Sequence, residues 1–140
     1  MGKPELDNLV KIGNLKTEAA SRSEFDGMVK SAHRGLADAQ NESIETDSQF
    51  DLAYEAAHKF ALAALRQQGY RSENRITVFQ TLVHTLAIGP ADIQIFLKAH
   101  NERNLAAYQG RVDIDKKLLA ELVNATKKLE SAVGRLTPPK

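Results

Sequence analysis

The sequence predicts an all-α fold, an up-and-down helical bundle of about five to six helices. Apolar residues recur at helical spacing through most of the chain, and glycine and proline fall between those segments. No alternation of apolar and polar residues lasts long enough to predict a strand. The 140 residues are enough for one domain with a single core, so we expect one domain over 1–140, with a frayed tail at 137–140.

Helix start and stop signals place the first three helices. Pro4 suits the first turn of a helix, so the first one is expected to begin there. Ser23 opens a weak capping box and Thr46 opens a better one, which predict the starts of the second and third helices. The third helix is rich in alanine on one face, which suits close helix packing, and Gly69 is expected to end it.

Three further helices follow a polar loop at 70–75. The fourth is expected to continue to about residue 86, and the fifth to run from Pro90 to about Tyr108, closed by Gly110. Asp113 can cap the sixth helix. The residues expected on the inner face of that helix alternate steps of three and four, as in helices of bundles: Leu119, Leu122, Thr126, Leu129, Val133 and Leu136.

Composition excludes several classes of protein. There is no cysteine, so disulfide scaffolds, thiolate zinc sites and thiol nucleophiles are excluded. No metal-binding motif, glycine-rich phosphate loop or nucleophile elbow occurs, and we expect no metal and no cofactor. The net charge of +1 gives no general attraction to nucleic acid. Because neither a signal peptide nor a membrane span is apparent, the expected location is the cytoplasm.

The fifth helix carries an unusual polar stripe. Its apolar inner face continues at the same spacing into His100, Arg103, Asn104 and Tyr108. Burying these groups without partners is costly, so they are expected at a cleft, a pocket or a subunit interface. Arginine binds phosphate oxygens with its planar fork, and histidine and tyrosine can move protons. The competing interpretation is structural, because polarity also rises where a helix leaves the core.

Other polar residues have weaker claims to function. His58 on the third helix is either a second wall of a polar pocket or a half-buried histidine with satisfied hydrogen bonds. His33 and His84 are open to the same two interpretations. A small basic patch around the loop at 70–75 competes with an ordinary solvated loop; its arginines are Arg66, Arg71 and Arg75.

The end of the fifth helix resembles the motif of the HEPN superfamily (higher eukaryotes and prokaryotes nucleotide-binding). The matching residues are Arg103, Asn104 and Tyr108, followed by the aspartate-rich segment 112–115. The alanine-rich segment 50–72 is also similar to a helix of that family, and the resemblance covers about 46–136. This chain differs from the family pattern by having Tyr108 in place of the motif histidine, and a phenol is a poor base at neutral pH.

Three alternative functions remain, and the first two follow from the resemblance. The first is a metal-independent ribonuclease, in which Arg103 stabilises charge on the phosphate, Asn104 orients it, and Tyr108 or His100 moves protons. The second, which we favour, is a weakly catalytic or non-catalytic module that binds a nucleotide or a partner through Arg103 and Asn104. The third is a structural dimeric interaction bundle. The family also implies a homodimer, with RNA, a nucleotide, a nucleotidyltransferase or an antitoxin as possible partners.

Overall fold

The computed structural model describes residues 2–110 and 114–140, and it is an all-α helical bundle as predicted. The helices are α1 (Lys3–Lys11), α2 (Arg22–Ala39), α3 (Thr46–Gln67), α4 (Arg75–Gln80), α5 (Leu82–Thr85), α6 (Pro90–Gln109) and α7 (Lys116–Gly134). Two short strands, β1 (Lys16–Thr17) and β2 (Tyr70–Arg71), pair in antiparallel fashion. No helix among the described residues is both long and apolar enough to cross a membrane.

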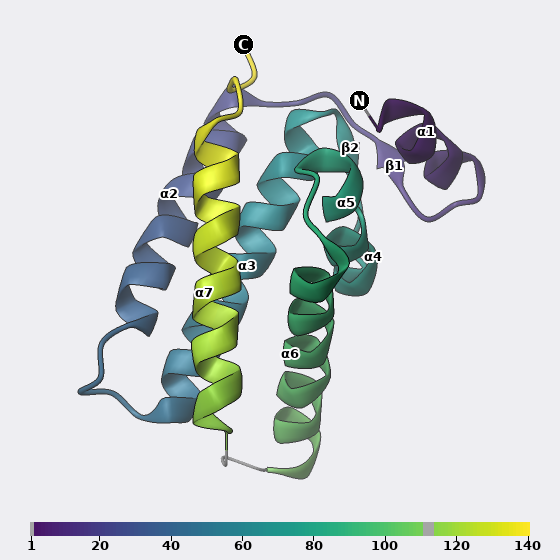
Figure 1. Cartoon of the computed structure of the whole chain (residues 1–140). Coiled ribbons are helices and arrows are strands. Elements are labelled where there is room, and N and C mark those ends of the chain that lie inside the picture. Colours follow the sequence, from purple (N-terminus) through teal and green to yellow (C-terminus); the bar gives the residue numbers. More distant parts are fainter. Residues whose placement is uncertain (1, 111–113) are drawn as a thin grey trace.

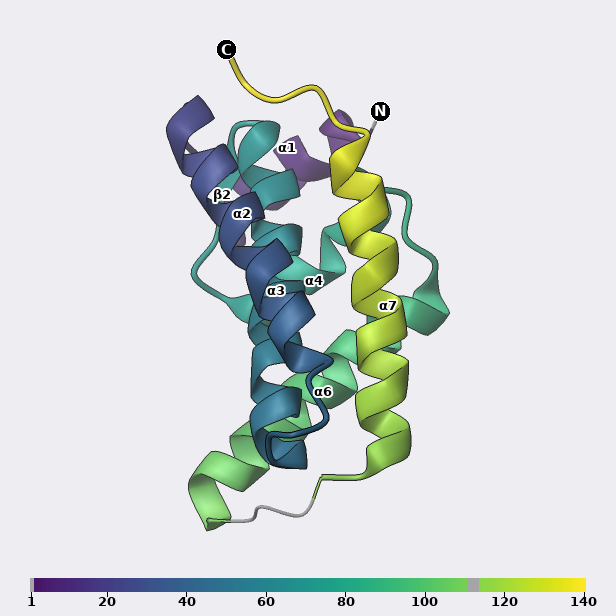
Figure 2. The same ribbon diagram turned by 90° about the vertical axis from the view of Figure 1, so that its left-hand side faces the viewer.

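The four long helices form the body of the bundle. In Figure 1, α2 and α6 run in one direction and α3 and α7 run in the other, which is the up-and-down arrangement. Helix α3 is central, because it packs against α2, α4, α6 and α7. The last turns of α6 project from the bundle in Figure 2, at the opposite end from the two termini. Side chains on the last turns of α6 that face α3 therefore lie near the end of the bundle that is opposite the two termini.

Helix starts differ from the predictions by one or two residues. Ser21, not Ser23, caps α2, because the Ser21 hydroxyl accepts the hydrogen bond of the Glu24 amide. Thr46 is the first residue of α3 and does not cap it. Helix α7 is capped by Asp115, whose carboxylate accepts from the Lys117 amide. The cap expected from the sequence, Asp113, lies outside the described residues.

The predicted fourth helix is two helices, which is a correction. Helix α4 ends at Gln80 and α5 begins at Leu82, with Thr81 between them. The Thr81 hydroxyl donates to the carbonyl of Val78, a local bond that competes with continuation of the helix. Val83 on α5 is 48% exposed.

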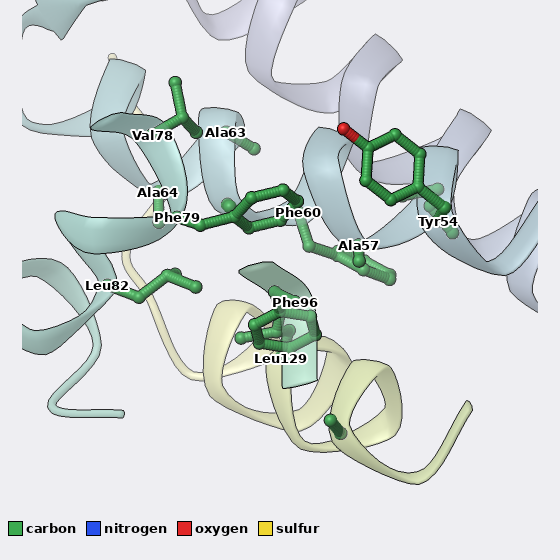
Figure 3. Close-up of a cluster of buried hydrophobic side chains, with 14 of the residues drawn as sticks. Tyr54, Ala57, Phe60, Ala63, Ala64, Val78, Phe79, Leu82, Phe96 and Leu129 are labelled. Carbon is green, nitrogen blue, oxygen red and sulfur yellow. The ribbon is translucent and has the colours of Figure 1, made fainter. Parts of the chain in front are cut away.

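The core is aromatic where α3, α4 and α6 meet. Figure 3 shows the side chains of Phe60, Phe79, Phe96 and Leu129 packed together, with Tyr54 at one end of the cluster. The rings of Phe79 and Phe96 are stacked with centroids 5.3 Å apart. Tyr54 is fully buried. The polar stripe of α6 thus begins beside an aromatic core, and Tyr54 links the two.

An arginine on α3 holds the N-terminal segment to the bundle. The Arg66 side chain is only 2% exposed, and its guanidinium donates to the Glu24 carboxylate at 2.7 Å. It also donates to the carbonyls of Glu18 and Ala19, at 2.8 and 2.7 Å. Arg66 therefore belongs to no basic patch, contrary to that interpretation, because its charge is neutralised inside the protein.

Candidate anion-binding site

A cluster of polar side chains lies where α3, α4 and α6 meet. We call it the Glu55 cluster, because the carboxylate of Glu55 on α3 is its centre. Helix α3 supplies the buried member of the cluster, and α6 supplies three members from consecutive turns. The cluster consists of Tyr54, Glu55, Arg75, His100, Arg103 and Asn104.

Two arginines converge on one oxygen of Glu55. Arg103 reaches Glu55 Oε2 at 2.9 Å and Arg75 reaches the same oxygen at 3.0 Å. Both guanidinium groups also lie over the Tyr54 ring, 5.0 Å and 5.5 Å from its centroid. About a third of each of the three charged side chains is exposed to solvent. The arginines are therefore held in place but stay accessible from outside.

His100 is held from both sides of its ring. Its Nδ1 lies 2.7 Å from the Tyr54 hydroxyl, and its Nε2 lies 3.2 Å from the Asn104 amide nitrogen. Burial and the positive charges of Arg75 and Arg103 lower the pKa of His100 below its ordinary value. The imidazole is therefore neutral at neutral pH, and both of its nitrogens are engaged.

His58 stands one turn along α3 from Tyr54. Its ring packs edge-on against Phe79, with centroids 6.0 Å apart. Burial, reinforced by the charge of Arg75, lowers the pKa of His58 to about 4. Because its ring is neutral and packed on an aromatic side chain, the half-buried structural interpretation of His58 fits this environment better than the pocket wall.

The charges of the Glu55 cluster do not cancel. Arg75 and Arg103 carry two positive charges, Glu55 carries one negative charge, and His100 is neutral, which leaves a surplus of +1 within the cluster. Asp51, which feels the charge of Arg103, offsets part of this surplus. Each guanidinium has five N–H donors, of which Glu55 occupies only part. A positive surplus with spare donors in a partly buried setting favours an anion, above all a planar or tetrahedral oxyanion.

Tyr108 does not join the cluster, although the sequence stripe placed it there. Its side chain is 93% exposed. At 3.6 residues per turn, eight residues rotate a side chain about 80° away from the starting direction. Tyr108 also lies two turns beyond His100, on the last turns of α6, which project from the bundle in Figure 2.

Sequence reasoning missed Glu55 and the role of Arg75. Arg75 appeared only as a loop residue, yet it is the first residue of α4 and reaches α3. The available signal for Glu55 was weak: it is a charged residue between Tyr54 and the alanine-rich inner face of α3. Of the remaining histidines, His33 pairs with Glu130 at 2.5 Å and so links α2 to α7.

Comparison with known proteins gives no relative for this chain: no family model, no curated protein and no solved structure matches it. Within residues 2–110 and 114–140, no three metal-ligating side chains lie close enough to hold a metal ion.

Proposed function

We propose that this chain is a HEPN-like binding module that holds a phosphate group of a nucleotide or an RNA at the Glu55 cluster. The observation that carries the proposal is the convergence of Arg75 and Arg103 on one carboxylate oxygen. A phosphate presents several oxygens to two guanidinium forks at once, which makes it a good match for this pair. As in the family it resembles, such a module belongs to a cytoplasmic toxin–antitoxin or nucleotidyltransferase-associated system and acts as a homodimer.

Binding without catalysis is favoured by the surroundings of His100. Both ring nitrogens already have partners, Tyr54 and Asn104. Tyr108, which occupies the motif position for a catalytic histidine, is turned out to solvent. Neither His100 nor Tyr108 therefore offers a free nitrogen or oxygen next to Arg75 and Arg103 for proton transfer.

A metal-independent ribonuclease is the second candidate, and one observation favours it. The lowered pKa of His100 leaves the imidazole unprotonated at neutral pH, which is the state that a general base requires. Arg103 stands one turn along α6 and is placed to stabilise charge on a phosphate. In this alternative, RNA binding displaces Asn104 from the ring and frees Nε2.

The experiment is RNA binding measured by fluorescence anisotropy, with a labelled single-stranded RNA at 50 and 200 mM salt. We expect Arg103→Ala and Arg75→Ala each to weaken binding about tenfold and to reduce its salt dependence. Arg34→Ala is the matched control, because Arg34 is exposed on α2 on the other side of α3. Equal affinities for all four proteins would rule out the Glu55 cluster as the binding site.

The same proteins incubated with RNA in EDTA separate the two candidates. Cleavage by the wild type that disappears in Arg103→Ala and His100→Ala supports the ribonuclease. Intact RNA together with arginine-dependent binding supports the binding module.

A further inference from the structure

His100 lies between two partners that can each donate or accept a hydrogen bond. The Tyr54 hydroxyl is 2.7 Å from Nδ1, and the side-chain amide of Asn104 is 3.2 Å from Nε2. A hydroxyl donates to an unprotonated nitrogen or accepts from a protonated one, and a carboxamide does the same with its nitrogen and its oxygen. The imidazole can therefore gain a proton and keep both hydrogen bonds, once the Asn104 amide rotates.

One buried aromatic ring brings His100 next to both arginines of the Glu55 cluster. The guanidinium groups of Arg75 and Arg103 lie 5.5 and 5.0 Å from the centroid of the Tyr54 ring, and the centroid of the His100 ring lies 6.0 Å from it. His100 and Arg103 are also three residues apart on α6, which makes their side chains neighbours on the helix surface. An anion held by the two arginines therefore lies close to the imidazole.

The charges of the two arginines oppose protonation of His100. Burial, together with the positive charges of Arg75 and Arg103, lowers the pKa of its imidazole. A phosphate bound to the two guanidinium groups brings a negative charge to the same place. That charge offsets the repulsion between the arginines and an imidazolium.

We infer that His100 is the third cation of the proposed anion site: when an anion binds Arg75 and Arg103, the imidazole takes up one proton from the solvent and becomes an imidazolium. The inference rests on the proposed function, because it adds a group and a proton to that same site. Binding and protonation favour each other, so affinity rises as the pH falls through the pKa that His100 has in the complex. It levels off below the lower pKa that His100 has in the free protein.

Other titratable groups around His100 must be separated from it. His58 on α3 has a pKa of about 4 and stays neutral between pH 6.0 and 7.5. Where α7 packs on α6, the ion pair of Lys128 with Asp92 lies about two turns of α6 from His100. The carboxylates of α3 that act on the arginines are Glu55 and Asp51. The substitution His100→Gln keeps all of these groups and removes only the imidazole.

The experiment measures binding of a labelled oligouridylate by anisotropy at pH 6.0 and 7.5 in 50 mM salt. Neither the phosphodiesters nor the uracil bases of this probe titrate in that range. We expect the wild type to bind about fivefold more tightly at pH 6.0, the effect of a unit charge about 6 Å from an anion in a partly exposed site. His100→Gln is expected to lose this dependence on pH, whereas the matched control His58→Gln keeps it.

Two measurements on the wild type make the inference independent of how well a variant folds. Calorimetric titration in two buffers of different ionisation enthalpy counts the protons taken up on binding, and we expect a fraction of one proton per chain at pH 6.0. Nuclear magnetic resonance of the ring nitrogens reports protonation directly. The chain has only four histidines, so the His100 signals are identified by their absence in His100→Gln.

The outcomes separate this inference from the proposed function. Binding without proton uptake, with a His100 ring that stays neutral in the complex, overturns the inference and leaves the phosphate site standing. Proton uptake that persists in His100→Gln assigns the proton to another group and also overturns it. If the oligouridylate binds at neither pH, the proposed function fails and this inference fails with it.

Discussion

If the Glu55 cluster binds phosphate as proposed, we expect Glu55→Gln to change stability and phosphate binding in opposite directions. The substitution keeps the size of the side chain and removes the negative charge that holds Arg75 and Arg103 together. A structural ion-pair network only loses stability from this change. A phosphate site also gains affinity, because the surplus charge of the cluster rises from +1 to +2.

The expected loss of stability is modest. Each of the two ion pairs is about one-third exposed, and such pairs contribute roughly 0.2–1 kcal/mol. Adding the repulsion between two arginines left without their shared carboxylate, we expect a loss of about 1–2 kcal/mol. For a chain of this length, that lowers the midpoint of thermal unfolding by about 2–8 °C.

The expected gain in affinity follows from Coulomb's law. Removing a unit negative charge about 6 Å from a bound phosphate is worth roughly 0.7–3 kcal/mol, for effective dielectric constants between 80 and 20. Because the cluster is partly exposed, we take about 1 kcal/mol, or about fivefold tighter binding. Salt reduces this gain, so it is largest at 50 mM and smaller at 200 mM.

The assay pairs thermal unfolding with RNA anisotropy for the wild type, Glu55→Gln and Glu130→Gln. Glu130→Gln is the control because it removes the same carboxylate charge from a hydrogen-bonded contact with His33 that links α2 to α7. We expect only Glu55→Gln to bind RNA more tightly. Lower stability with no gain in affinity over the control would refute the reasoning and leave Glu55 as the centre of a structural network.

Three further predictions follow from other residues. Arg66→Met leaves the Glu24 carboxylate and several carbonyls without their buried donor, so we expect the free energy of unfolding, measured by thermal unfolding, to fall by about 3 kcal/mol. The control Arg34→Met, on the exposed face of α2, is expected to change that free energy little. His58 is neutral in the folded state and binds a proton more readily when unfolded, so the free energy of unfolding is expected to fall as the pH drops from 6.5 to 4. Chemical denaturation at several pH values should show a weaker dependence of that free energy on pH for His58→Gln than for the wild type. An unchanged dependence contradicts the lowered pKa of His58. Tyr108→Ser is expected to leave stability unchanged and to shift a homodimer toward monomer in sedimentation velocity, and a wild-type chain that sediments as a monomer at every concentration contradicts the expected dimer.

Helical periodicity predicted the long helices correctly, but it did not predict the break at Thr81 or the cap of α2. The apolar spacing of the long helices is dictated by burial, so the sequence records it directly. The break at Thr81 depends on a side-chain hydrogen bond to Val78, which leaves no periodic trace. The choice of Ser21 over Ser23 as a cap depends on where the backbone of the preceding segment leaves the helix. The sequence also carries a local signal that the prediction missed, because Ser21 and Glu24 fit the S-x-x-E capping-box pattern and Ser23 with Asp26 does not.

The candidate site was predictable only along a single helix. His100, Arg103 and Asn104 share one side of α6, and a helical projection finds them together. Tyr108 was misplaced in the cluster because the last turns of α6 extend past the bundle, which the spacing along one helix does not show. Glu55 and Arg75 are brought to the same place by the packing of α3, α4 and α6, and that packing has no signature in the spacing of one segment.

The buried guanidinium of Arg66 sets a limit on how far the chain can be trimmed. The segment 46–136 is the part that resembles HEPN domains. A fragment of that segment lacks the carbonyls of Glu18 and Ala19 and the carboxylate of Glu24, to which Arg66 donates. It also uncovers the side of α3 against which α2 packs. We therefore expect a stable truncated form of the chain to begin before Glu18.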